Sequence, residues 1–83
     1  MKKKKCQCCW YLTLDIDSLF DICEVCYWQN DAVQNDDINY TWWANELSLK
    51  ESRENYKKFG ASDILFKNDV RTPLEDEDEK VNL

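Results

Sequence analysis

The sequence predicts a small α+β domain, and three observations support this prediction. Two short apolar runs, at residues 10–14 and 18–22, have the length of β-strands. A later segment that begins at Ser48 has the capping pattern and periodicity of a helix. Five cysteines among 83 residues, with one glycine and one proline, indicate that thiols supply the extra stability that so short a chain needs.

The two apolar runs predict a β-hairpin. "WYLTL" at 10–14 and "SLFDI" at 18–22 flank the polar break "DID" at 15–17. One cysteine pair lies just before the first run and another directly follows the second. We therefore expect the hairpin to bring the two cysteine pairs together.

Residues 29–46 are rich in Asn and Asp, which favour turns, and are expected to form a loop with apolar anchors. Trp42 and Trp43 lie near the end of this loop. We expect one of them to pack on the helix and hairpin while the other is partly exposed. The functional alternative is an aromatic anchor for a protein partner, since tryptophan is enriched in binding hot spots.

A helix is predicted from Ser48 to Phe59. Ser48 and Glu51 have the spacing of a capping box, and Gly60 suits the left-handed position after a helix. One face carries apolar residues at helical spacing, namely Leu49, Tyr56 and Phe59. Arg53, on the same face, is expected to clamp a carboxylate or loop carbonyls, the alternative being a substrate contact. A second short helix can start at Ser62 and must end before Pro73.

Four cysteines predict a metal site. Cys6 with Cys9 and Cys23 with Cys26 form two C-x2-C pairs, with thirteen residues between them. Such pairs can give the four tetrahedral sulfur ligands that zinc prefers. Because four thiolates fill the coordination sphere, we expect one structural, non-catalytic zinc ion per chain.

Disulfides and unliganded core thiols are the alternatives to a metal. Disulfides would leave one of the five cysteines unpaired, and reduced thiols are the rule in the cytoplasm. Cys8 adjoins Cys9, and neighbouring cysteines cannot easily point at one ion. Cys8 is therefore expected to pack in the core, with a redox, supporting or substitute-ligand role as the alternative.

Charge and hydropathy bear on location and partners. The net charge is −6, which repels phosphate backbones and disfavours nucleic-acid binding. No apolar run resembles a secretory signal or a membrane span, so we expect a cytoplasmic protein. The expected organisation is a basic extension at 1–5, one zinc-binding domain at 6–74, and an acidic, disordered tail at 75–83.

Four stretches of the chain resemble a small bacterial family named for its cysteine-rich CPCC motif. They are "CQCCWYLTL", "FDICEVCYWQND", "WWANELSLKESRENYKKFG" and "VRTP", which occur in the family's order between residues 6 and 73. The resemblance implies a zinc-binding domain with Cys6, Cys9, Cys23 and Cys26 as ligands, and it implies no activity.

The chain departs from the family pattern at several positions. Gln7 and Glu24 replace prolines, and Trp42 and Trp43 replace a glycine pair. Trp10 replaces a glycine after the first cysteine pair, where such turns often need a positive φ.

The fold class is therefore a metal-stabilised α+β domain with a zinc-ribbon-like β-hairpin, whose two C-x2-C knuckles pack on one or two short helices. With no histidine and a saturated metal, an enzyme is not expected. We expect a protein-interaction module, specifically an acidic inhibitor or immunity-type protein that covers a basic partner. The alternative is a zinc-ribbon protein associated with nucleic acid.

Overall fold

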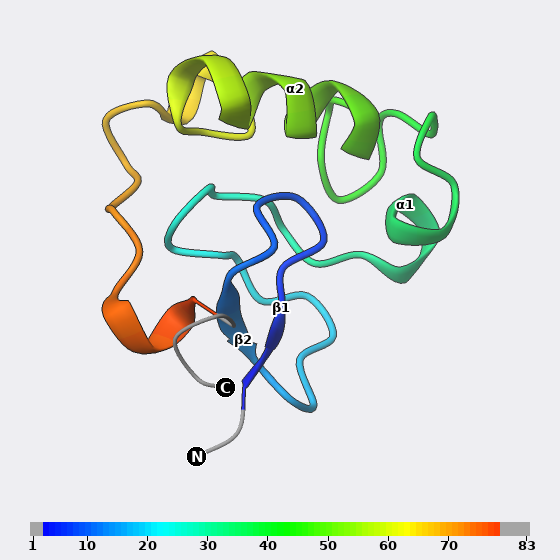
Figure 1. Ribbon diagram of the computed structural model, residues 1–83. Coiled ribbons are helices and arrows are strands. Elements are labelled where there is room, and N and C mark those ends of the chain that lie inside the picture. Colours follow the sequence, from blue (N-terminus) through cyan, green and yellow to red (C-terminus); the bar gives the residue numbers. More distant parts are fainter. Residues whose placement is uncertain (1–2, 79–83) are drawn as a thin grey trace.

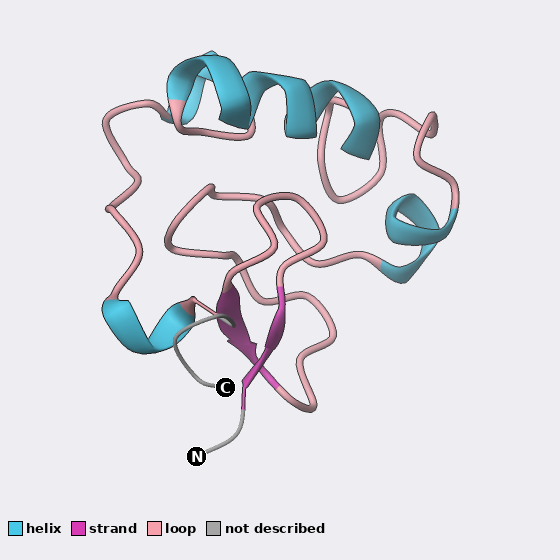
Figure 2. Cartoon of the chain, viewed as in Figure 1, coloured by secondary structure: helices cyan, strands magenta, loops and turns pink. Residues whose placement is uncertain are grey.

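The computed structural model describes residues 3–78 (Figure 1). In chain order the elements are β1 (Lys3–Lys5), β2 (Leu12–Asp15), α1 (Ala32–Asp36), α2 (Leu49–Phe59) and two 3-10 helices, η1 (Ile64–Phe66) and η2 (Glu75–Glu77). Helix α2 runs along one side of the molecule and the β1–β2 hairpin lies toward the other, with the cysteine loops between them. Loops and turns make up much of the chain, as Figure 2 shows.

The hairpin differs from the one that the apolar runs predicted. Strand β2 pairs with β1, antiparallel and with an irregularity between Lys4 and Lys5, and not with residues 18–22. Of the predicted second strand, only Ile22 forms an isolated bridge, to Gln29. The chain reverses at the first cysteine pair, which places β1 beside β2, and the Lys3 ammonium lies 2.6 Å from the Asp15 carboxylate. The predicted pairing of residues 10–14 with 18–22 is therefore wrong, whereas a two-stranded antiparallel hairpin is present.

The predicted loop at 29–46 contains a short helix that the sequence did not reveal. Asp31 caps α1, because its carboxylate accepts hydrogen bonds from the backbone N–H groups of Val33 and Gln34. Asp31 and Gln34 are both almost fully buried. This helix therefore turns two polar side chains toward the interior.

Helix α2 confirms the prediction at both ends. The capping box of Ser48 and Glu51 is formed, and Gly60 takes a left-handed conformation with φ 76°. Leu49 and Ser52 are buried, and Tyr56 packs against the core. Phe59 is 36% exposed, so the buried face ends before the last turn.

The second predicted helix shrinks to the single turn η1. Asp63, not Ser62, caps it by accepting from the Leu65 N–H. The buried Ser62 instead donates its N–H to the carbonyl of Cys26, at 2.7 Å. This bond ties the segment after α2 to the second cysteine pair.

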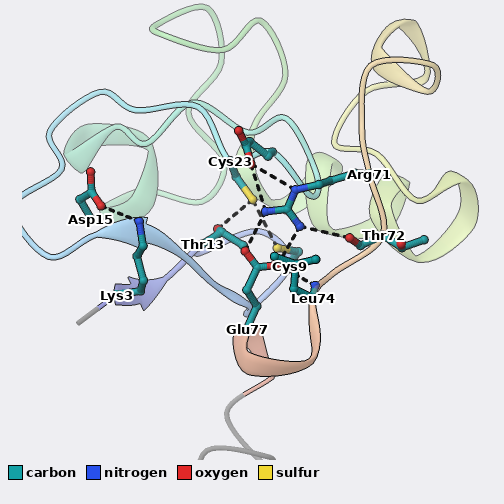
Figure 3. A network of polar contacts seen from close by, with 10 residues as sticks. Lys3, Cys9, Thr13, Asp15, Cys23, Arg71, Thr72, Leu74 and Glu77 are labelled. Carbon is teal, nitrogen blue, oxygen red and sulfur yellow. Dashed lines mark hydrogen bonds and ion pairs between the residues drawn. The ribbon is translucent and has the colours of Figure 1, made fainter. Parts of the chain in front are cut away.

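The C-terminal segment is fastened by Arg71 (Figure 3). Its guanidinium donates to both carboxylate oxygens of Glu77, at 2.8 and 2.7 Å, and to Glu24 at 3.1 Å. These bonds hold the pKa of the Glu77 carboxyl below its usual value.

The two segments expected at the ends of the chain contain regular structure. The segment 75–83, expected as a disordered tail, begins with the helix η2, and residues 79–83 lie outside the described part. Likewise, β1 falls within the expected extension at 1–5.

The core is built around thiols. Its buried members are Cys6, Cys8, Cys9, Leu14, Cys23, Val25, Cys26, Trp28 and Leu49. Tyr11 and Tyr56 pack against them. Between residues 3 and 78, no helix has the length and apolar character needed to cross a membrane.

Candidate metal centre

Two similar backbone turns hold the four paired cysteines. In the first knuckle (residues 6–9), Trp10 N–H donates to the Cys6 carbonyl at 2.8 Å; in the second (residues 23–26), Tyr27 N–H donates to the Cys23 carbonyl at 2.7 Å. Trp10 and Tyr27 both have φ 71°. The positive φ expected at Trp10 is confirmed, whereas Tyr27 was not foreseen, although it occupies the same position after the second pair. Each such residue costs about 1–3 kcal/mol, which the surrounding fold must offset.

The four sulfur atoms converge on one point. The Sγ atoms of Cys6, Cys9, Cys23 and Cys26 all lie within 4.8 Å of one another, and all four residues are buried. Cys6 and Cys26 are 3.5 Å apart and Cys9 and Cys23 are 3.7 Å apart, sulfur to sulfur. A tetrahedral zinc ion with Zn–S bonds of about 2.3 Å requires sulfurs about 3.8 Å apart. The group can therefore hold a metal ion with little rearrangement.

Hydrogen-bond donors surround three of the sulfurs. The N–H of Cys8 lies 3.4 Å from Cys6 Sγ, and the N–H of Trp28 lies 3.4 Å from Cys26 Sγ. The hydroxyl of Thr13 lies 3.0 Å from Cys23 Sγ (Figure 3). Such donors stabilise thiolates and fix the orientation of ligands. Sequence reasoning missed Thr13, whose only signal was a polar residue in an otherwise apolar run.

The close approach of the thiols shifts their pKa values. The nearby Cys26 thiol lowers the pKa of the Cys23 thiol, and the nearby Cys23 thiol raises the pKa of the Cys26 thiol. Four thiols cannot all ionise this close together without a cation. A bound metal ion would supply that cation and displace the remaining protons.

The fifth cysteine has a different place. Cys8 is 3% exposed and does not belong to the converging group, so it packs in the core as expected. All five cysteines are free thiols. The disulfide alternative therefore finds no support in this arrangement.

Arg53 joins the first knuckle to helix α2. Its Nε–H donates to the Gln7 carbonyl at 2.8 Å, which confirms the expected clamp on a loop carbonyl. Its Cζ lies 4.8 Å from the ring centroid of Trp10. The clamp and the cation–π contact together hold the knuckle against the helix.

The paired tryptophans do not take the expected positions. Trp42 is 74% exposed and Trp43 is 59% exposed, so the expectation that one of them packs on the helix and hairpin is wrong. The neighbouring Asn45 contacts the interior instead. Its side-chain Nδ2 donates hydrogen bonds to the carbonyl of Gln29 and to Oε1 of Gln34. These polar contacts hold the loop without burying either indole.

Comparison with known proteins bears on the whole domain. No protein with curated annotation matches the chain. The family model described as "Cysteine-rich CPCC" matches residues 4–77, a span that includes both knuckles, α2 and Arg71. The chain therefore belongs to the cysteine-rich CPCC family.

Proposed function

We propose that this protein is a non-catalytic, zinc-stabilised interaction module that binds a basic protein through its exposed tryptophans, in the manner of a small inhibitor or immunity-type protein. The observation that carries this proposal is the turn of residues 40–47, here called the tryptophan turn. It exposes two indoles on a backbone fixed by buried polar groups. The proposal has two parts, the metal and the binding surface.

Zinc is the metal that suits the cysteine cluster best. Four closely spaced sulfurs favour zinc or iron–sulfur chemistry, and single-ion tetrahedral sites of this kind are usually zinc. We assign Cys6, Cys9, Cys23 and Cys26 as its ligands. Four thiolates leave no open position for water or substrate, and the sequence contains no histidine. The ion would therefore maintain the fold rather than catalyse a reaction.

Gln34 is the centre of the network that supports the tryptophan turn. This fully buried side chain donates from Nε2 to the carbonyls of Tyr40, Asn45 and Leu47, at 3.0, 3.1 and 3.2 Å. Its Oε1 accepts from both the N–H and the side-chain amide of Asn45, each at 2.9 Å. The Asp31 carboxylate accepts from the Ala44 N–H at 3.2 Å. A turn held this way loses little conformational entropy on binding.

The turn also stores backbone strain beneath its exposed rings. Trp42 has φ 60°, and its N–H donates to the Glu46 carbonyl at 3.0 Å. Trp43 packs edge-to-face with Tyr40, with ring centroids 6.0 Å apart. Strained positions gather at functional sites, and exposed tryptophans are frequent anchors of protein interfaces.

The overall charge favours a basic partner. A net charge of −6 accelerates encounters with a basic protein and weakens binding to phosphate backbones. The association rate should therefore fall as salt rises, whereas the two indoles, once covered by the partner, should govern the dissociation rate.

A pull-down from the native cell followed by binding kinetics tests this function. Wild-type protein and the double variant Trp42→Ala, Trp43→Ala serve as parallel baits, and only proteins that the double variant loses count as partners. Trp43→Ala alone should speed dissociation about 30-fold, equivalent to about 2 kcal/mol. Leu65→Ala is the matched control, because Leu65 is 74% exposed but lies in η1. Recovery of DNA or RNA as the only tight ligand, or turnover of a small molecule by homogeneous protein, contradicts the proposal.

A further inference from the structure

A pocket of about 500 Å³ lies where the first knuckle meets helix α2. Three cationic side chains line it, namely Lys5, Arg53 and Lys57. One carboxylate, that of Asp78, lies among them. Three positive charges against one negative charge leave the lining at a formal +2, in a chain whose net charge is −6. The pocket lining is thus positively charged in a protein whose net charge is negative.

Two of these cations are placed to receive an anion. Arg53 is held by its bond to Gln7 and by the Trp10 ring, so its guanidinium is already oriented. Lys57 follows one turn later on the same face of α2. Among residues 3–78, no side chain or carbonyl forms a hydrogen bond or ion pair with the Lys57 ammonium. Lys5 and Asp78, by contrast, already have interactions of their own.

Aromatic rings form much of the remaining lining. Tyr11 and Tyr56 are partly buried and Trp10 is half exposed, and all three border the pocket. A volume of about 500 Å³ lies within the usual range for small-molecule sites, which combine apolar walls with a few polar groups. The lining therefore suits a ligand with one flat apolar part and one charged part.

We propose that this pocket binds a compound that carries both a carboxylate and an aromatic ring, either as a small free acid or as the C-terminal aromatic residue of a peptide. The carboxylate would bind Arg53 and Lys57, and the ring would contact Trp10, Tyr11 and Tyr56. A monoanion suits the site better than a phosphate dianion, because Cys9 also borders the pocket and a zinc centre with four thiolates carries a formal charge of −2. No residue of the tryptophan turn lines this pocket, so the proposal stands apart from the function above.

A competing account gives these cations a purely electrostatic role. They would offset the negative thiolate centre and bind nothing. On that account, the pocket binds no organic acid, and Lys57→Glu weakens zinc binding only. On ours, Lys57→Glu weakens acid binding.

Titration calorimetry on the zinc-loaded full chain tests the proposal, with 3-phenylpropionate as the probe. Acetate, which lacks the ring, and 3-phenylpropionamide, which lacks the charge, are the comparison ligands. We expect saturable binding of 3-phenylpropionate, at least tenfold tighter than either comparison. Acetate loses the burial of the ring and 3-phenylpropionamide loses the hydrogen bonds to charged groups, and each loss accounts for about that factor or more. Lys57→Glu should weaken it at least tenfold, and Lys57→Arg should keep it within about threefold.

Lys58→Glu is the matched control, because it makes the same charge change on the neighbouring exposed residue, outside the pocket. It should change the affinity by less than about twofold at physiological salt. A peptide ending in phenylalanine, with a free or an amidated C-terminus, separates the two sources of the ligand. A free-ended peptide that binds more tightly than 3-phenylpropionate identifies a peptide terminus, and weaker binding identifies a small acid. Absence of binding up to about 10 mM, or equal effects of Lys57→Glu and Lys58→Glu, overturns the proposal.

Discussion

Thr13 Oγ1 lies 3.0 Å from Cys23 Sγ, so a residue of strand β2 contacts the second knuckle directly. The contact links two segments that the chain separates by nine intervening residues. It also places a neutral donor against a sulfur whose negative charge a metal would stabilise. Strand β2 therefore both supports the fold and adjusts the candidate metal centre.

Removal of this hydroxyl should weaken zinc binding. Thr13→Val keeps the shape of the side chain but leaves Cys23 without its donor. We expect a loss of about tenfold in zinc affinity, measured by competition with a chromophoric chelator. Thr13→Ser, which retains the hydroxyl, should stay close to wild type. Equal affinities of the valine and serine variants would show that the contact has no influence on the metal.

The ligand assignment predicts one zinc ion per chain. Native mass spectrometry of protein purified without chelator should show the mass of one bound zinc. Cys23→Ser should lose the ion, because three thiolates and a hydroxyl form a much poorer site. Cys8→Ser should retain it, since Cys8 lies outside the converging sulfurs. Equal loss of zinc in both variants would refute the assignment.

Zinc removal should unfold the domain. Cysteines make up much of the buried core, so we expect metal binding to supply a large part of the folding free energy. A strong chelator should abolish the near-ultraviolet circular dichroism of the four tryptophans, and added zinc should restore it. An unchanged spectrum after verified metal removal would mean that packing alone maintains the fold.

Arg71 should contribute measurably to stability. Arg71→Lys loses the paired bonds to the two Glu77 oxygens, and we expect about 1–2 kcal/mol lower unfolding free energy in urea. Solvent limits the contribution of these bonds, because the Arg71 side chain is about one third exposed. Lys3→Gln removes an ion pair whose two side chains are 41% and 51% exposed, and it should leave the free energy of unfolding almost unchanged. If both substitutions lower the free energy of unfolding by similar amounts, the Arg71–Glu77 pair contributes no more than an ordinary surface ion pair.

Gln34 should be one of the most sensitive positions outside the cysteines. Gln34→Leu leaves several partly buried backbone groups of the tryptophan turn without partners, which costs about 3 kcal/mol or more. Gln29→Leu is the control, because Gln29 enters this network only through its backbone. Urea unfolding of zinc-loaded protein measures both. A loss below about 1 kcal/mol for Gln34→Leu would show that the turn does not depend on this side chain.

Local signals in the sequence predicted local structure well. Ser48, Glu51 and Gly60 lie within or next to the helix they delimit, so the bounds of α2 could be derived without knowing the rest of the fold. The spacing of the cysteines likewise indicated the four sulfurs that converge. Both patterns act over a few residues, where stereochemistry leaves few alternatives.

Strand pairing could not be derived in the same way. The apolar run at 18–22 resembled a strand, yet Leu19 and Phe20 are 74% and 59% exposed. The true partner, Lys3–Lys5, has no apolar pattern, and its place follows from the direction of the chain at the first knuckle. The role of Gln34 was equally hidden, because its partners are carbonyls that only the folded loop brings together.

The similar backbone turns of the two knuckles bear on how the chain folds. Each closes over a few residues, through one hydrogen bond to the carbonyl of its first cysteine. In either knuckle, two of the four expected ligands of a metal ion are already adjacent. Binding of the second knuckle to the same ion then closes a loop of only thirteen residues. We therefore expect the ion to act as the folding nucleus, with α2 and the Arg71 segment joining later. Refolding should then speed up as zinc concentration rises, until loop closure becomes rate-limiting.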